Sequence, residues 1–233
     1  MSDSVRYALY YVPNAASALY RFGASTIGYD AYAASELPFP DAALNAFADW
    51  REMTSDPRKY GFHATLKAPF ALNDGTGEAD LLAAFGDFAQ MPRAIPQISP
   101  VIRSIGRFIA VVPDVPVDAL NALADDCVRA FDHLRKPLTE QDRARRLKSP
   151  LTDNQIRHLD RWGYPYVFEE FRFHMTLSGS LPEDKREPAQ ALLRSQFAML
   201  KPSALTIDSL TLLRQEGSSA RFVVMKQAAL TRA

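Results

Sequence analysis

The sequence predicts an α+β fold in which two lobes pack together as one domain. A short pattern of strand-forming residues, Phe-His-x-Thr-Leu, occurs twice, at 62–66 and at 173–177. After each copy the chain has the same order of elements, a helix and then a hairpin. No low-complexity linker separates the two halves. Residues 1–233 are therefore predicted to form a single bilobal unit.

Strands are predicted where β-branched and aromatic residues cluster between turn residues. The segments, in chain order, are 6–12, the first Phe-His-x-Thr-Leu copy up to Pro69, a hairpin within 96–112, the second copy up to Gly179, and a hairpin of 205–213 with 221–226. Both copies of the repeated pattern are thus expected on strands, where side chains are held rigidly.

Helices are predicted where apolar residues recur every three or four positions, or where a capping residue precedes such a run. The segments are 15–22, 42–50, 78–90, 117–134, 152–162 and 183–200. The polar and basic stretch from Leu138 onward has no counterpart in the first lobe. We interpret residues 138–162 as an insertion that lies over the site, and as a candidate lid.

The composition limits the class of partner. The chain has 27 basic and 27 acidic residues and no net charge, so a membrane or an extended nucleic acid is not the expected partner. A small phosphorylated substrate needs only a local cluster of cations. One cysteine, no apolar signal core at the N-terminus and no apolar run of about 18 residues favour a cytoplasmic protein, which we expect to be a monomer.

Cofactor motifs are absent from the sequence. There are four histidines, none at His-x-x-x-His spacing, and there is no Cys-x-x-Cys pair. No glycine-rich phosphate loop is present either. We therefore predict neither a metal nor another cofactor.

The repeated pattern places chemistry on one face of each strand. Residues two apart in a strand share a face, so His63 and Thr65 project together, as do His174 and Thr176. A histidine titrates near neutral pH and a threonine hydroxyl can donate to an anion. Two such units that face each other would form a paired acid/base site around a bound anion. Further candidates for binding the substrate or its phosphate are Lys67 on the His63 face, Arg172 and Ser178 on the His174 face, and Tyr60 beside the first copy.

These motifs resemble those of the 2H phosphoesterase superfamily. Three segments, 60–67, 162–166 and 171–177, resemble more narrowly a bacterial branch that is encoded near phosphonate-metabolism genes. The resemblance implies a bilobal, pseudo-twofold symmetric fold, with antiparallel sheets that line a central cleft and helices outside. It also implies metal-independent cleavage of phosphodiesters, often cyclic ones.

We therefore expect a phosphodiesterase that hydrolyses a small cyclic phosphodiester, either a cyclic nucleotide or a cyclic phosphosugar of phosphonate metabolism. His63 and His174 would be the general acid and base, in an order that the sequence leaves open. Thr65 and Thr176 would donate to the phosphate oxygens. Two alternatives stay open: a 2′,3′-cyclic phosphodiesterase or ligase-like enzyme that processes RNA ends, and a non-catalytic sensor of a sugar phosphate or nucleotide.

Overall fold

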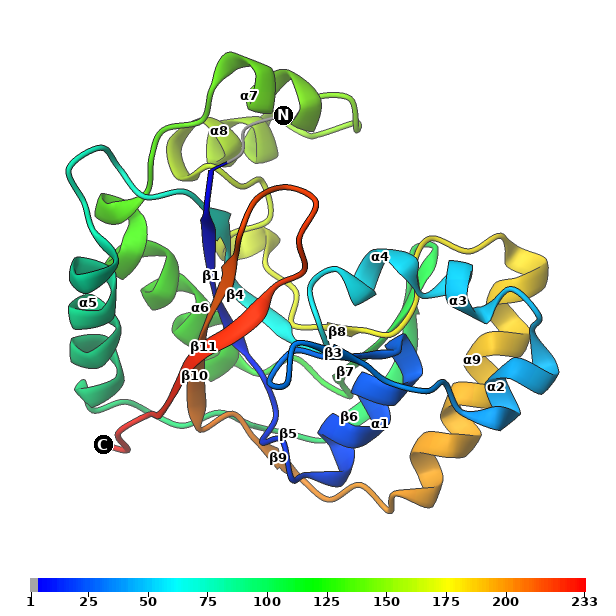
Figure 1. Cartoon of the computed structure of the whole chain (residues 1–233). Coiled ribbons are helices and arrows are strands. Elements are labelled where there is room, and N and C mark those ends of the chain that lie inside the picture. Colours follow the sequence, from blue (N-terminus) through cyan, green and yellow to red (C-terminus); the bar gives the residue numbers. More distant parts are fainter. Residues whose placement is uncertain (1–3) are drawn as a thin grey trace.

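The computed structural model describes residues 4–233 and shows a central sheet with helices around it (Figure 1). The sequence-based expectation about the N-terminus rests partly on residues 1–3, which lie outside the described residues. The strands of the main sheet are β1 (Arg6–Tyr11), β4 (Ala64–Phe70), β6 (Pro100–Ile105), β7 (Phe108–Pro113), β8 (Met175–Thr176), β10 (Ser209–Gln215) and β11 (Val223–Ala229).

The main sheet has the strand order β11-β10-β1-β4-β8-β7-β6, and every neighbouring pair is antiparallel. Two small sheets accompany it. They pair β2 (Tyr29–Asp30) with β3 (Ser35–Glu36), and β5 (Gln97–Ile98) with β9 (Leu205–Thr206). The predicted α+β class with antiparallel sheets is confirmed.

The two halves of the sheet are interleaved along the chain. The hairpin β6–β7 follows the first His-x-Thr strand in sequence but pairs with the second, β8. The hairpin β10–β11 follows the second His-x-Thr strand but pairs with β1, next to the first, β4. The halves meet at the junction of β4 and β8, so the centre of the sheet is also the place where the two motifs come together.

Helices pack against each half of the sheet. The helices are α1 (Ala18–Ile27), α2 (Asp41–Ala46), α3 (Trp50–Met53), α4 (Ser55–Arg58), α5 (Glu78–Gln90), α6 (Asp118–Phe131), α7 (Glu140–Arg146), α8 (Asp153–Trp162) and α9 (Glu183–Met199), with the 3-10 turns η1 (Asp132–Leu134) and η2 (Phe168–Glu170). Helix α5 contacts β10 and β11, α6 contacts β4, and α9 contacts β6 and β7. Helices α7 and α8 lie together beyond one end of the sheet, away from the other helices (Figure 1).

Most predicted helices are present, with three differences. The helix predicted at 15–22 is α1, which the Ser17 hydroxyl caps and which continues to Ile27, before the left-handed Gly28. The predicted helix 42–50 is divided into α2 and α3, because Phe47 is extended and Trp50 turns inward, where its indole N–H donates to the Thr26 carbonyl. The basic stretch after Leu138, for which no helix was predicted, contains α7, whose first turn is capped by the Thr139 hydroxyl. The role of 138–162 as a lid stays a prediction.

Candidate functional site

The two repeated motifs lie side by side because β4 pairs with β8. Ala64 stands opposite Met175 in this antiparallel pair, and both side chains are fully buried. Continuing the register by one residue in each direction places His63 across from Thr176, and Thr65 across from His174. Cross-strand neighbours have β-carbons about 4.5–5.5 Å apart. The four residues His63, Thr65, His174 and Thr176, here called the His–Thr cluster, therefore project from one face of the sheet.

A backbone carbonyl just before its strand and an aromatic ring hold His63 in one orientation. Its Nδ1 donates to the Gly61 carbonyl at 2.8 Å, so in the neutral ring Nε2 is the acceptor, 3.2 Å from the Thr65 hydroxyl. The ring stacks on Tyr10 with centroids 3.7 Å apart. Behind it, the buried Phe62 packs on Gly23 of α1, where any β-carbon would overlap the Phe62 ring. The unprotonated Nε2 thus faces the cluster.

His174 has the same arrangement in the second motif. Its Nδ1 donates to the Arg172 carbonyl at 2.6 Å, two residues earlier in the chain, as His63 does to Gly61. Its ring lies 5.5 Å from that of Phe108 on β7. Within residues 4–233, no protein group is hydrogen-bonded to Nε2 of His174, which leaves this atom open to a ligand.

Burial keeps both imidazoles neutral near pH 7. Desolvation lowers the pKa of His63 from 6.5 to about 4, and the nearby charge of His174 acts in the same direction. Burial also lowers the pKa of His174. The two rings are close enough to influence each other, as a paired acid/base site requires. A bound anion would raise both pKa values, because an opposite charge favours the protonated ring.

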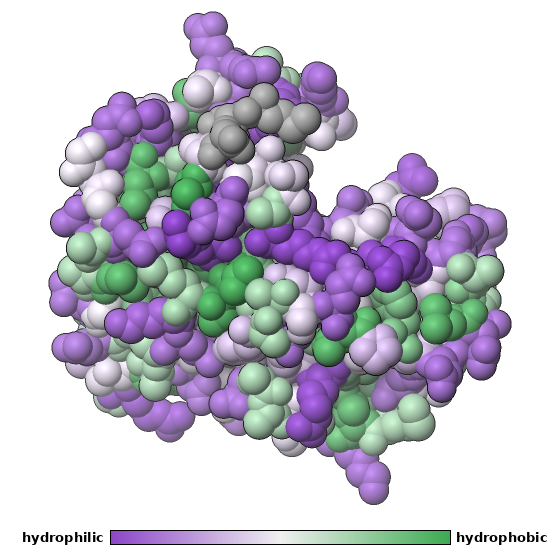
Figure 2. Space-filling model, in the orientation of Figure 1, coloured by the Kyte–Doolittle hydropathy of each residue, from purple (hydrophilic) through white to green (hydrophobic). Residues whose placement is uncertain are grey.

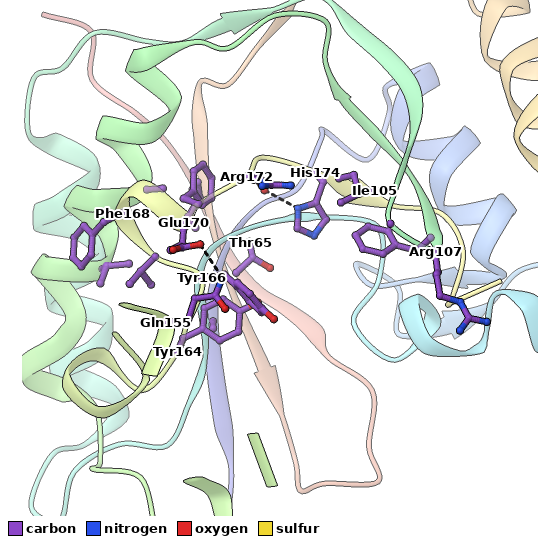
Figure 3. Close-up of a pocket in the computed structure, with 18 residues that line it drawn as sticks. Thr65, Ile105, Arg107, Gln155, Tyr164, Tyr166, Phe168, Glu170, Arg172 and His174 are labelled. Atoms are coloured by element: carbon purple, nitrogen blue, oxygen red, sulfur yellow. Dashed lines mark hydrogen bonds between the residues drawn. The ribbon is translucent and has the colours of Figure 1, made fainter. Parts of the chain in front are cut away.

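A cavity of about 570 Å³ extends from the Thr65 and His174 side of the cluster. Its walls are mostly apolar and aromatic, and come from β4, the β6–β7 turn, α6 and the segment around η2. The lining residues are Thr65, Leu66, Ala68, Ile105, Gly106, Arg107, Phe108, Ala124, Val128, Gln155, Tyr164, Tyr166, Val167, Phe168, Glu170, Phe171, Arg172 and His174. In Figure 3, Thr65 and His174 lie at the centre, and Glu170, Gln155 and Phe168 lie beyond Thr65. Figure 2 shows the surface hollowed between the α7–α8 region and the lobe that holds α3 and α4.

The cavity lining includes one acidic side chain, Glu170, and hydrogen bonds hold its carboxylate in place. The carboxylate of Glu170 accepts from the Gln155 amide at 2.8 Å and from the Asn154 amide at 3.4 Å. Among the described residues, no cation lies within salt-bridge distance of it. Both amides come from α8, so α8 holds Glu170 in place at this end of the cavity.

Two of the predicted phosphate contacts lie next to the cluster. Arg172 lines the cavity beside His174 and is exposed. The Tyr60 ring lies 6.2 Å from the His63 ring and stacks on Phe222. Both residues are therefore placed where a substrate bound at the cluster can reach them.

Lys67 does not line the cavity. Its ammonium is 4% exposed, donates to the Val128 carbonyl of α6 at 3.0 Å and lies 3.4 Å from Asp132 Oδ1. The cause is a bulge: Tyr10 pairs with Thr65, but Leu9 pairs with Lys67, so one step on β1 corresponds to two on β4. The regular alternation that predicted a shared face for His63 and Lys67 is therefore broken at this point.

Ser178 also turns away from a phosphate-binding role. It is 1% exposed; its hydroxyl accepts from the Ile109 N–H and donates to the Gly179 carbonyl, both at 3.0 Å. Strand β8 ends at Thr176, so the face that was extended to Ser178 in the sequence analysis is not continued. Ser178 fixes the chain to β7 instead.

Several site residues were missed by local sequence patterns. Tyr10 stacks on His63 from a different strand, and Gln155 and Glu170 reach the cavity from the segment around α8. The pairing of β1 with β4 would have revealed Tyr10, but strand pairing is not encoded in the local motif. Within the described part of the chain, no group of three or more His, Cys, Asp or Glu side chains could hold a metal ion, and no helix is both long and apolar enough to cross a membrane.

The comparison with protein families identifies one match. A family described as "Protein of unknown function (DUF1045)" matches residues 65–223, which include Thr65 and the whole second motif. The match thus covers more than half of the chain.

Two curated proteins are similar in sequence. Both are named "Ribose 1,5-bisphosphate phosphokinase PhnN". The protein from Janthinobacterium sp. (strain Marseille) is 37% identical over 224 residues, covering 94% of this chain and 49% of that protein. The protein from Laribacter hongkongensis (strain HLHK9) is 32% identical over 179 residues, covering 77% of this chain and 41% of that protein. The chain spans less than half the length of each.

Two solved structures have a similar outline. One described as "Crystal structure of phosphoesterase" has a TM-score of 0.44 at 12% identity, and covers 98% of this chain and 99% of that one. E. coli LigT complexed with 3′-AMP has a TM-score of 0.41 at 12% identity, with 98% and 99% of the two chains covered. At this level of similarity, the function has to be derived from the site itself.

Proposed function

Because the chain belongs to the DUF1045 family, whose description gives no activity, we propose from its site that it is a metal-independent phosphodiesterase of the 2H phosphoesterase type. The observation that carries the proposal is the pairing of Ala64 with Met175, which brings two His-x-Thr units to one face of the sheet. Each His-x-Thr unit has one imidazole, which can act as the acid or as the base in a given step but not as both. The two units together would supply the acid and the base.

The chemistry follows from the orientation of the imidazoles. One neutral Nε2 takes a proton from water while the water oxygen forms a bond to phosphorus. The other ring, protonated when the anionic substrate is bound, gives its proton to the alkoxide that leaves as the P–O bond breaks. Thr65 and Thr176 donate hydrogen bonds to the non-bridging phosphate oxygens, where negative charge develops. Each proton transfer contributes about 10²–10⁴ in rate.

The proposed substrate class is a five-membered cyclic phosphate on a ribose. The relatives' name supports the phosphosugar form. Hydrolysis of ribose 1,2-cyclic phosphate 5-phosphate at the bond to O2 yields ribose 1,5-bisphosphate, the compound in that name. Such a reaction would belong to phosphonate metabolism. The chain has no glycine-rich phosphate loop, so we do not propose kinase activity for it.

The test is hydrolysis of a substrate panel in the presence of EDTA. The panel contains ribose 1,2-cyclic phosphate 5-phosphate and the four nucleoside 2′,3′-cyclic phosphates, assayed with the wild type, His63→Ala and His174→Ala. We expect turnover of at least one substrate by the wild type and a loss of about 10²–10⁴ in each variant. Full turnover in either variant, or no turnover of any substrate by the wild type, would contradict the proposal.

A further inference from the structure

Helix α7 carries three arginines, and only one of them lacks a carboxylate partner. Arg143 pairs with Asp160 at 2.6 Å, and Arg145 pairs with Asp142 at 2.7 Å. Arg146 has no carboxylate within 4.0 Å in the part of the chain that the structure describes. Its guanidinium instead lies over the ring of Tyr164, 5.4 Å from the centroid. Arg146 is half-buried, whereas Arg145 is exposed. Among the α7 arginines, Arg146 is therefore the one without a carboxylate partner, and it contacts the cavity wall at Tyr164.

Arg146 borders the cavity through Tyr164. Tyr164, which it covers, lines the cavity together with Thr65 (Figure 3). Burial raises the pKa of the Tyr10 phenol well above its usual value, as do the phenols of Tyr60 and Tyr164, while the charges of Arg6 and Arg146 lower it. Arg6 and Arg146 therefore both act electrostatically on the phenol of Tyr10, whose ring stacks on His63.

Arg6 is the second cation of this group. Its guanidinium lies 5.7 Å from the Phe222 ring, on which Tyr60 stacks, and its Nε donates to the Gln215 side chain at 2.8 Å. Gln215 is neutral, so the charge of Arg6 is not cancelled. Arg6 and Tyr60 thus both contact Phe222, while Arg146 contacts Tyr164. Guanidinium and phenol groups are donors that suit an anion with several oxygens.

At the Glu170 end the cavity does not suit an anion. Glu170 holds a negative charge there, without a cationic partner among the described residues, and the adjacent Phe168 and Val167 are apolar. A negatively charged group of the ligand would be repelled from that end. Glu170 would therefore direct an anionic group toward the cations of the site, which are Arg107 and Arg172 in the lining and Arg146 over Tyr164.

We propose that Arg146, together with Arg6 and the phenols of Tyr60 and Tyr164, binds a second phosphate of the substrate, a monoester carried on the same sugar as the cyclic diester. The inference rests on the proposed function and narrows its substrate to a phosphosugar. The segment 138–162 then has a role, because it contributes the arginine that recognises the monoester. A nucleoside 2′,3′-cyclic phosphate lacks this group and would leave Arg146 unused.

Kinetics on two matched substrates test the proposal. Ribose 1,2-cyclic phosphate is compared with and without its 5-phosphate, using the wild type, Arg146→Gln, Arg146→Lys and the control Arg145→Gln. We expect Arg146→Gln to lower kcat/KM for the 5-phosphorylated substrate by about 10-fold or more, and to leave the other substrate unchanged. Arg146→Lys should retain most of the preference, and Arg145→Gln all of it. An equal loss on both substrates, or no loss on either, would overturn the proposal.

A binding measurement separates this inference from the proposed function. Ribose 5-phosphate carries the monoester but no cyclic diester, so the binding that calorimetry detects in the wild type and not in Arg146→Gln reports on the second site. We expect binding by the wild type and Arg145→Gln, its loss in Arg146→Gln, and weaker binding at higher salt. If the wild type does not bind it, the second site is refuted even when cyclic diesters are hydrolysed. If it binds while no diester is hydrolysed, the second site stands and the phosphodiesterase proposal fails.

Discussion

Thr65 of the first motif lies next to His174 of the second, at facing positions where β4 pairs with β8, and both residues line the same cavity. The register that produces this relationship also places Thr176 across from His63. Each threonine therefore lies next to the histidine of the other motif as well as its own. A phosphate bound at the His–Thr cluster would contact groups from both motifs, so the two units would act on one ligand.

Replacing Thr65 with valine tests this shared role. Valine keeps the shape and the strand propensity but removes the hydroxyl that now lies 3.2 Å from His63 Nε2. We expect kcat/KM for the best cyclic phosphate to fall by about 10–100-fold, while Thr65→Ser retains most of the activity. Thermal unfolding of both variants should match the wild type. An active Thr65→Val enzyme would mean that the hydroxyl does not contact the phosphate.

The buried state of His63 predicts a pH dependence of stability. Its pKa is about 4 in the folded protein and near 6.5 when unfolded, so the unfolded chain binds the proton more tightly. The stabilisation is present above about pH 6.5 and is lost as the pH falls toward 4, by up to about 3 kcal/mol. The free energy of unfolding, measured with urea between pH 7.5 and pH 4.5, should fall less steeply in His63→Phe. Parallel curves for the two proteins would rule out this contribution.

Lys67 is expected to matter for stability and not for turnover. Lys67→Met removes the ammonium that donates to the Val128 carbonyl and pairs with Asp132. In the variant, the Asp132 carboxylate still pairs with Arg135 at 2.9 Å and with Arg161 at 3.3 Å. We expect a loss of about 1–3 kcal/mol in the free energy of unfolding, because the Val128 carbonyl loses its charged donor. The kcat of the folded enzyme should be unchanged. A large fall in kcat with normal stability would restore Lys67 as a phosphate contact.

Ser178→Ala should show the same separation of stability from activity. The variant leaves the buried N–H of Ile109 without the hydroxyl that now accepts from it at 3.0 Å. An unsatisfied buried donor costs about 1–3 kcal/mol, so the urea midpoint should decrease. KM for the cyclic phosphate is expected to stay at the wild-type value. Ser180→Ala, on the exposed residue two positions later, is the control and should change neither quantity.

The sequence predicted the local elements well because their signals are local. The helix 78–90 coincides with α5, since its apolar spacing and its turn residues lie within the segment itself. The cap of α8 at Thr152 is present as well, with a reciprocal bond between Thr152 and Gln155. The placement of His63 with Thr65 needed only the period of a strand, and the structure keeps both on the face that the motif predicted.

What the sequence could not show depends on contacts between distant segments. The bulge that turns Lys67 toward α6 arises from the pairing of β4 with β1, some sixty residues earlier in the chain. Ser178 is fixed by Ile109, which belongs to a different hairpin. Arg146 and Tyr164 meet because α8 folds back between them, and no periodicity in the sequence records that contact.

The interleaved order of the strands has a consequence for how the chain folds. Each half of the sheet pairs strands that are far apart in the sequence, so neither half can form until distant segments meet. Loop closure over such separations is entropically costly and slows folding. A fragment that ends after α6 would lack β8, β10 and β11, and one that begins at α7 would lack β1, β4, β6 and β7. Neither fragment should fold alone, whereas the two mixed together should complement each other. The two imidazoles would then come together in the same cooperative step, because the pairing of β4 with β8 joins both the two motifs and the two halves of the sheet.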